Sequence, residues 1–117
     1  MMITIYGIPN CNTVKKALDW LDEHGCNYKL HNFKKDGLSE SKLDEWFGVF
    51  GWDKVLNKAG LTYKKLSDEQ KNKIVDDSSA KHFLLANTSA VKRPLVEKGG
   101  QAILLGFSTA DFEKLLL

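Results

Sequence analysis

The chain has 117 residues, of which 43% are hydrophobic and 27% charged, as is ordinary for one globular domain with its own core. Lys and Arg number 17 against 15 Asp and Glu, so the net charge of +2 gives no electrostatic case for nucleic acid or a membrane as partner. The sequence lacks both a long apolar run and the pattern of a secretory signal. We therefore expect a cytoplasmic protein without nucleic-acid or membrane partners.

The N-terminal third predicts a strand, a helix and a second strand. Residues 3–6 are rich in β-branched and aromatic side chains, and Gly7 and Pro9 end that strand. Gly25 is a natural stop for the following helix. A second strand is expected from Tyr28 to Phe33. The helix has one apolar face with the spacing i, i+3, i+4, i+7, formed by Val14, Ala17, Leu18 and Leu21.

The middle of the chain predicts helices only. Ser39 can cap a helix whose apolar residues again have helical spacing. Ser67 and Gln70 form a capping box that opens a short helix to about Asp76, and a further helix is expected over roughly 79–88. The first of these helices should bury Leu43, Trp46, Phe47 and Phe50.

Strands return at the C-terminal end. Residues 93–96 and 101–105 flank Gly99-Gly100, which predicts a β-hairpin, and Ser108 can cap a last helix. The resulting order is β-α-β, a helical insert, then β-β-α.

This order is typical of an α/β, thioredoxin-like domain with a mixed sheet. We expect one domain over 1–117, with its core in 1–35 and 89–117 and an inserted helical subdomain over about 36–88.

Cys11 lies where the first strand pattern gives way to the helical one. The first turn of a helix presents unbonded backbone N–H groups and the positive end of the helix dipole, here around Asn12 and Thr13. These favour a thiolate, the form that attacks disulfides and oxyanions, and Lys15 adds positive charge. A small buried hydrophobe is the alternative reading, but the flanking turn-forming and polar residues favour a reactive thiol. Cys26, before an apolar strand, is expected to be buried.

Pro94 directly precedes a predicted strand. In thioredoxin-like folds a cis-proline at this place lies opposite the active thiol, although an ordinary trans-proline at a strand start is the alternative. Arg93 would then project toward Cys11 as a clamp for a carboxylate or an oxyanion.

Metal binding and a structural disulfide are not expected. The chain has two cysteines and no Cys-x-x-Cys, so both are predicted to be free thiols. Its three histidines are far apart in the sequence and predict surface positions: His24, His31 and His82.

Three tracts resemble the arsenate reductase-like family, which includes glutaredoxin-coupled arsenate reductases, Spx regulators and smaller YffB-like relatives. The tracts are Tyr-Gly-Ile-Pro-Asn-Cys-Asn-Thr at the N-terminus, the helical insert, and Lys-Arg-Pro-Leu-Val near the C-terminus. The resemblance covers essentially the whole chain. It is closest to the YffB-like group on residues 5–17, Gly51-Trp52, Leu56-Asn57-Lys58 and Arg93-Pro94.

The resemblance implies a monothiol oxidoreductase, a glutathione-dependent thiol reductase with Cys11 as nucleophile. Glutathione would be a co-substrate rather than a bound cofactor, glutaredoxin a further partner, and the protein a monomer. Binding of substrate or glutathione is assigned to Asn12, Thr13, Lys15, Arg93 and Pro94.

Two alternatives stay open. One is arsenate reduction at a weakened oxyanion site, because the family's arginine in the insert is replaced by Asn57 and the region 105–108 has no cation. The other is an Spx-like regulator that binds RNA polymerase. The Spx redox switch, however, needs a cysteine where this chain has Val14.

Overall fold

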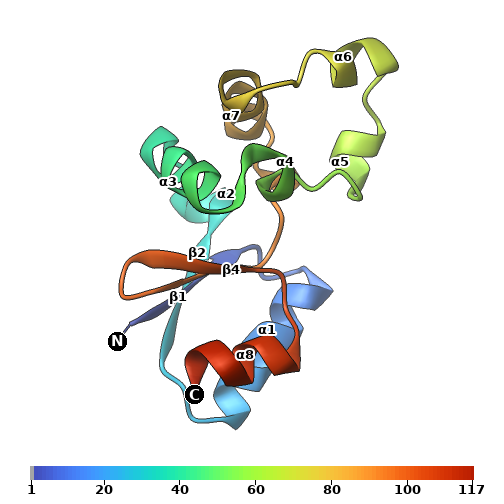
Figure 1. The fold of residues 1–117 in the computed structure, drawn as a ribbon. Coiled ribbons are helices and arrows are strands. Elements are labelled where there is room, and N and C mark those ends of the chain that lie inside the picture. Colours follow the sequence, from blue (N-terminus) through green and yellow to red (C-terminus); the bar gives the residue numbers. More distant parts are fainter. Residues whose placement is uncertain (1) are drawn as a thin grey trace. The chain divides into compact units, whose positions relative to one another are not determined.

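The computed structural model describes residues 2–117 and contains two compact units (Figure 1). The first comprises the chain through Asp36 together with Arg93–Leu117, and the second is Gly37–Lys92. No helix among the described residues combines the length and the apolar character needed to cross a membrane.

The first unit is built on a four-stranded mixed sheet of order β2-β1-β3-β4. β1 pairs with β2 in parallel and with β3 antiparallel, and β3 pairs antiparallel with β4. The predicted hairpin is confirmed, with Gly99 and Gly100 at φ values of 60° and 81° that suit glycine. The strands are β1 (Ile3–Gly7), β2 (Tyr28–Asn32), β3 (Leu95–Lys98) and β4 (Gln101–Leu105).

Two helices, α1 (Asn12–Glu23) and α8 (Thr109–Leu116), share one hydrophobic core with the sheet. Trp20 of α1 belongs to this core although the predicted apolar face omitted it, whereas Leu18 is only partly buried. The cluster of buried residues is Ile3, Ile5, Ala17, Trp20, Leu21, Val96, Phe112 and Leu116. With strands in the order β-α-β and β-β-α, the fold is thioredoxin-like, as the sequence predicted.

The second unit is helical. Its longer helices, α3 (Glu40–Phe50) and α7 (Asp77–Ala86), contact each other, and both contact α4 (Trp52–Val55). Leu56 forms an isolated antiparallel bridge with Val91, which ties the end of α4 to the end of the unit. The remaining short pieces are α5 (Leu61–Lys64), α6 (Asp68–Asn72) and the 3-10 turn η1 (Thr88–Ala90).

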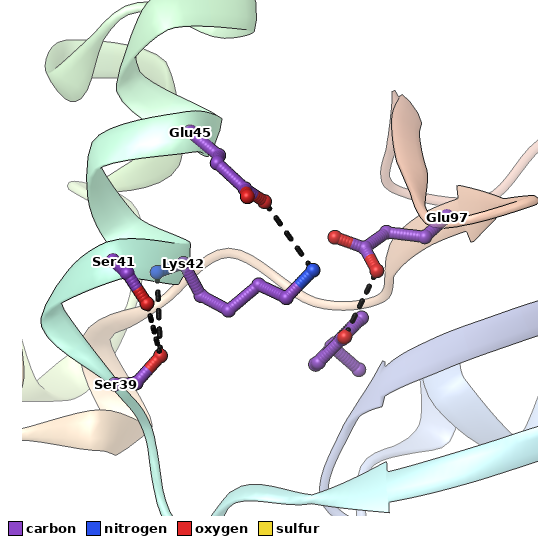
Figure 2. A network of polar contacts seen from close by, with 6 residues as sticks. Ser39, Ser41, Lys42, Glu45 and Glu97 are labelled. Carbon is purple, nitrogen blue, oxygen red and sulfur yellow. Dashed lines mark hydrogen bonds and ion pairs between the residues drawn. The ribbon is translucent and has the colours of Figure 1, made fainter.

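Helix caps show where the sequence-based boundaries were right and where they were wrong. Ser39 caps α3 by accepting the Lys42 N–H at 3.3 Å (Figure 2), and the capping box of Ser67 is present. However, α6 ends at Asn72 and not near Asp76, because Asp76 is itself the N-cap of α7. The second strand likewise ends at Asn32, since Phe33 begins the short helix α2 (Phe33–Asp36).

Candidate active site

One edge of the sheet carries the predicted chemistry. Tyr6 in β1 lies opposite Leu95 in β3, and Leu95 lies opposite Leu105 in β4. The end of β1, the start of β3 and the end of β4 therefore meet at the same edge. The loop to Cys11 leaves from this edge, and Arg93 enters it directly before β3.

Cys11 is the N-cap residue of α1, with extended φ and ψ of −98° and 125°. Its backbone is fixed on both sides, because its N–H donates to the Ile8 carbonyl at 3.3 Å and its carbonyl accepts from Lys15 at 2.9 Å. Within the described residues its side chain makes no capping hydrogen bond. The half-buried Cys11 thus lies at the start of a twelve-residue helix. The sequence predicted a reactive thiol at this position, and that role stays a prediction.

The other residues predicted to belong to the site follow Cys11 in the first turns of α1. Asn12, Thr13 and Lys15 are all exposed on α1. Asn12 and Thr13 are the first two residues of the helix, and Lys15 is the fourth. Their roles in binding stay predictions.

The Arg93–Pro94 peptide bond is cis, so the expected cis-proline is confirmed. Pro94 is buried, and its carbonyl accepts the Gly106 N–H at 2.7 Å. Arg93 is half-buried, and its Nη1 is buried without a hydrogen-bond partner among the described residues. Because a guanidinium donor is rarely buried without an acceptor, this atom marks a place where an anionic ligand would complete the hydrogen bonding.

Cys26 corrects one expectation. The sequence predicted a buried thiol, but Cys26 is only partly buried, like Cys11, and packs against the core from the far end of α1. The degree of burial therefore does not distinguish Cys26 from Cys11.

The two thiols cannot form a disulfide with each other in this fold. The twelve residues of α1 separate them, a rise of about 18 Å, whereas a disulfide needs Cα atoms within about 7 Å. Both cysteines are free, as predicted.

Sequence reasoning missed a buried polar pair that links β1 to β3. Tyr6 donates its hydroxyl hydrogen to Oε1 of Glu97 at 2.9 Å, and Glu97 is only 2% exposed. Figure 2 shows the Glu97 carboxylate with this hydrogen bond as a dashed line. A lone acid next to Lys98 at the end of a strand reads as solvated, so the signal lay in the pairing of β1 with β3 and not in the local pattern. Since Tyr6 lies opposite Leu95 and Glu97 opposite Thr4, the hydrogen bond runs diagonally between β1 and β3.

The histidines do not form a metal site. His24 and His82 are exposed, whereas His31 is partly buried and lies 4.7 Å from the Tyr6 ring, centroid to centroid. Among residues 2–117, no group of three His, Cys, Asp or Glu side chains is arranged to hold a metal ion.

Comparison with known proteins decides the family. The model of the ArsC family matches residues 6–115. The chain belongs to the ArsC family. This ArsC-family chain is 41% identical over 112 residues to an uncharacterised protein of Haemophilus influenzae, and the match covers 96% of each chain.

Solved structures agree with this ArsC-family assignment. The structure named YffB is 40% identical with a TM-score of 0.91, and the match covers 98% of this chain and 99% of that one. An arsenate reductase (ArsC) related protein of Brucella melitensis is 43% identical with a TM-score of 0.79, covering 98% and 94%. The protein is thus arsenate reductase-like, with a fold of the thiol oxidoreductase type.

More distant relatives include regulators. The global transcriptional regulator Spx of Listeria monocytogenes is 32% identical over 68 residues, which is 56% of this chain and 52% of that protein. That similarity covers about half of each chain.

Proposed function

We propose that this ArsC-family protein is a monothiol oxidoreductase that uses glutathione as co-substrate, with the Cys11 thiolate as nucleophile. The observation that carries the proposal is the pairing of two incomplete groups at one edge of the sheet. The Cys11 sulfur lies at an uncapped helix start, and Arg93 Nη1 is a buried donor without an acceptor. A ligand that offers both a sulfur and an anion would satisfy the two together.

The chemistry needs two exchanges. The Cys11 thiolate attacks the glutathione sulfur of a mixed disulfide, so that a new S–S bond forms, the old one breaks, and the leaving thiolate takes up a proton. A second glutathione thiolate then attacks the Cys11–glutathione disulfide. It regenerates the Cys11 thiolate and leaves as oxidised glutathione, which balances the two electrons delivered to the substrate.

The resolving thiol has to come from another molecule. Cys26 lies beyond the opposite end of α1, and the chain has no second cysteine within a turn of Cys11. A second glutathione or a glutaredoxin would supply the attacking sulfur. A monomer in the cytoplasm, where glutathione keeps thiols reduced, is the expected setting.

Binding of glutathione is assigned to charge and backbone around the sulfur. Arg93 Nη1 would donate to a glutathione carboxylate, a charge-assisted contact worth more than a neutral hydrogen bond. Lys15 would add long-range attraction. The N–H groups of Asn12 and Thr13 would face the sulfur, and the extended backbone before Pro94 would lie along the tripeptide.

Mass spectrometry of the intact protein after incubation with oxidised glutathione tests the proposal. We expect one glutathione adduct at Cys11 that forms fastest once the thiolate is populated and is released by reduced glutathione. The Cys26→Ser variant is the matched control and should form the same adduct at the same rate. An adduct confined to Cys26 would refute the assignment.

Arsenate reduction is the second candidate, because the free Arg93 donor would also suit an oxyanion. Asn57, half-buried in the second unit, replaces the arginine expected by resemblance. The adjacent cation, Lys58, has its ammonium 5.2 Å from the Trp52 ring centroid. Arsenate-dependent consumption of NADPH, with glutathione, glutathione reductase and glutaredoxin present, separates the two reactions. The thiol reductase proposal expects no consumption above the rate of a Cys11→Ser control.

A further inference from the structure

Tyr6 is the last residue of β1 that carries a side chain, and two contacts fix the position of that side chain. Its hydroxyl donates to Oε1 of Glu97 at 2.9 Å, and its ring centroid lies 4.7 Å from the ring centroid of His31 in the neighbouring strand β2. Both members of the hydrogen-bonded pair are buried, with Tyr6 7% exposed and Glu97 2% exposed. Buried polar pairs of this kind rigidify the structure around them, and the thiol chemistry proposed above gives this pair no task.

The segment after Tyr6 leads to Cys11 with little slack. Gly7 packs so closely against α1 that a Cβ there would lie 2.8 Å from Cγ2 of Val14. The Ile8 carbonyl then accepts the Cys11 N–H at 3.3 Å. A displacement of the end of β1 would therefore move the residue that carries the sulfur.

Tyr6 is also in register with the segment that carries Arg93. It lies opposite Leu95, which follows Arg93 by two residues. On the other side of β3, the pairing with β4 shifts register between Val96 and Glu97, so this ladder is irregular next to the residue that Tyr6 contacts. The diagonal hydrogen bond from Tyr6 to Glu97 therefore supports β3 at a point where its pairing with β4 is disturbed.

We propose that Tyr6, anchored on Glu97, is a positioning residue that fixes the end of β1, and with it Cys11, relative to the start of β3, and with it Arg93. The inference rests on the proposed function, because it gives Tyr6 a task within the same site. Without the Tyr6 hydroxyl both reacting groups are still present, but their separation varies. An anion held by Arg93 would then less often present its reacting atom to the sulfur.

Alkylation of Cys11 by two reagents tests the inference. Iodoacetate has a carboxylate that Arg93 can bind, whereas iodoacetamide has the same shape and no charge. The two rates are measured at Cys11 by peptide mass spectrometry at one pH, and their ratio cancels any change in the population of the thiolate. We expect Arg93→Gln to lower the ratio of the iodoacetate rate to the iodoacetamide rate about tenfold, and Tyr6→Phe to lower it about threefold to tenfold.

A variant that combines both changes distinguishes positioning from a merely structural role. If Tyr6 acts through Arg93, the combined variant should have the same rate ratio as Arg93→Gln alone. Ile3→Val is the control for lost packing, because Ile3 is a buried residue at the other end of β1, and it should keep the ratio to within about twofold.

Variants of the acceptor examine the same hydrogen bond if Tyr6→Phe does not fold. Glu97→Leu removes the acceptor and should lower the rate ratio as much as Tyr6→Phe. Glu97→Gln offers the Tyr6 hydroxyl an amide oxygen in place of the carboxylate and should restore most of the ratio lost in Glu97→Leu.

Three results would overturn the inference: an unchanged rate ratio in Tyr6→Phe, multiplicative losses in the combined variant, or an equal loss in Ile3→Val. Failure of the proposed function gives a different result. If the wild type forms no glutathione adduct at Cys11 and its rate ratio still depends on Tyr6, glutathione is rejected and the role of Tyr6 is kept. An adduct at Cys11 together with a ratio that is independent of Tyr6 does the reverse.

Discussion

The N-termini of α1 and α7 differ in whether the side chain of the cap residue accepts a hydrogen bond from the first backbone N–H groups of the helix. At α7 the Asp76 carboxylate accepts from the Ser79 N–H at 2.8 Å, and the Asp76 N–H donates in return to the Ser79 hydroxyl oxygen at 3.1 Å. At α1 the cap residue is Cys11, whose side chain accepts no hydrogen bond from the helix within the described residues. The helices α3, α6 and α8 are capped in the same manner as α7, by the side chains of serines 39, 67 and 108.

An oxygen cap and a sulfur at the same helix position differ in what they contribute, the first to helix stability and the second to reactivity. An oxygen cap satisfies the first backbone donors of a helix and contributes about 1 kcal/mol to stability. A sulfur in the same position leaves those donors to stabilise a thiolate, and it is nucleophilic. Among the described helices of eight residues or more, α3, α7 and α8 thus start with an oxygen cap, whereas α1 does not.

Cys11→Ser is expected to have the largest effect, because it removes the nucleophile and supplies the missing cap. Formation of the glutathione adduct and any thiol reductase activity should fall to background. The free energy of unfolding should stay equal or rise by up to about 1 kcal/mol, since serine caps better than cysteine. Adduct mass spectrometry and urea denaturation measure the two outcomes. A variant that stays active, or that loses stability, would contradict the comparison.

Much of this contrast could be predicted from the sequence. Caps and tight turns depend on nearby residues, so the sequence predicts them locally. The helix starts are indicated by Ser39, Ser67 and Ser108, and the hairpin by Gly99-Gly100. The position of Cys11 between strand and helix patterns was equally local.

Features set by tertiary contacts could not be read in this way. The burial of Glu97 depends on Tyr6 from a strand distant in sequence, and Trp20 joins a core that α8 completes. The partial exposure of Cys26 and the orphaned Nη1 of Arg93 are also consequences of packing. At Asp76 the prediction is wrong although the signal is local, because the Asp-x-x-Ser spacing marks a helix cap and not the end of the preceding helix.

Arg93→Gln should have the next largest effect. It removes the charged donor, so the second-order rate of reaction between Cys11 and oxidised glutathione should fall about 10- to 100-fold, as expected for one charge-assisted hydrogen bond. Stopped-flow mixing followed by mass detection measures this rate. The reaction with iodoacetamide, a neutral reagent, should change little.

The neighbouring exposed cation provides the control for Arg93. Lys92→Gln changes the same net charge without touching the buried donor, and it should retain the rate to within a factor of about two. Equal losses in the two variants would show that net charge, and not the Arg93 donor, attracts the co-substrate.

Gly7→Ala should have a smaller effect, which concerns both the packing of α1 and the reactivity of Cys11 at its start. A Cβ at Gly7 would lie 2.8 Å from Cγ2 of Val14, a fully buried and stiff side chain in the first turns of α1. The helix start has to shift, so we expect a loss of about 1–3 kcal/mol in unfolding free energy and slower alkylation of Cys11. Adding Val14→Ala to Gly7→Ala should restore the alkylation rate even if stability stays low. If alkylation is unchanged in the single variant, the placement of the thiol does not depend on this contact.

The smallest expected effect concerns the closed cap of α7 and its pH dependence. The Ser79 hydroxyl, and then its backbone N–H, hold the pKa of the Asp76 carboxyl below its usual value in the folded state. The unfolded chain therefore binds a proton more readily, and the cap's contribution is complete above the ordinary Asp pKa and lost as the pH falls through the lowered one. Thermal unfolding of the wild type and of Asp76→Asn should thus differ most near neutral pH and converge in acid. The rate of Cys11 alkylation should be the same in both proteins at every pH, because this cap supports structure in the second unit and takes no part in the thiol chemistry.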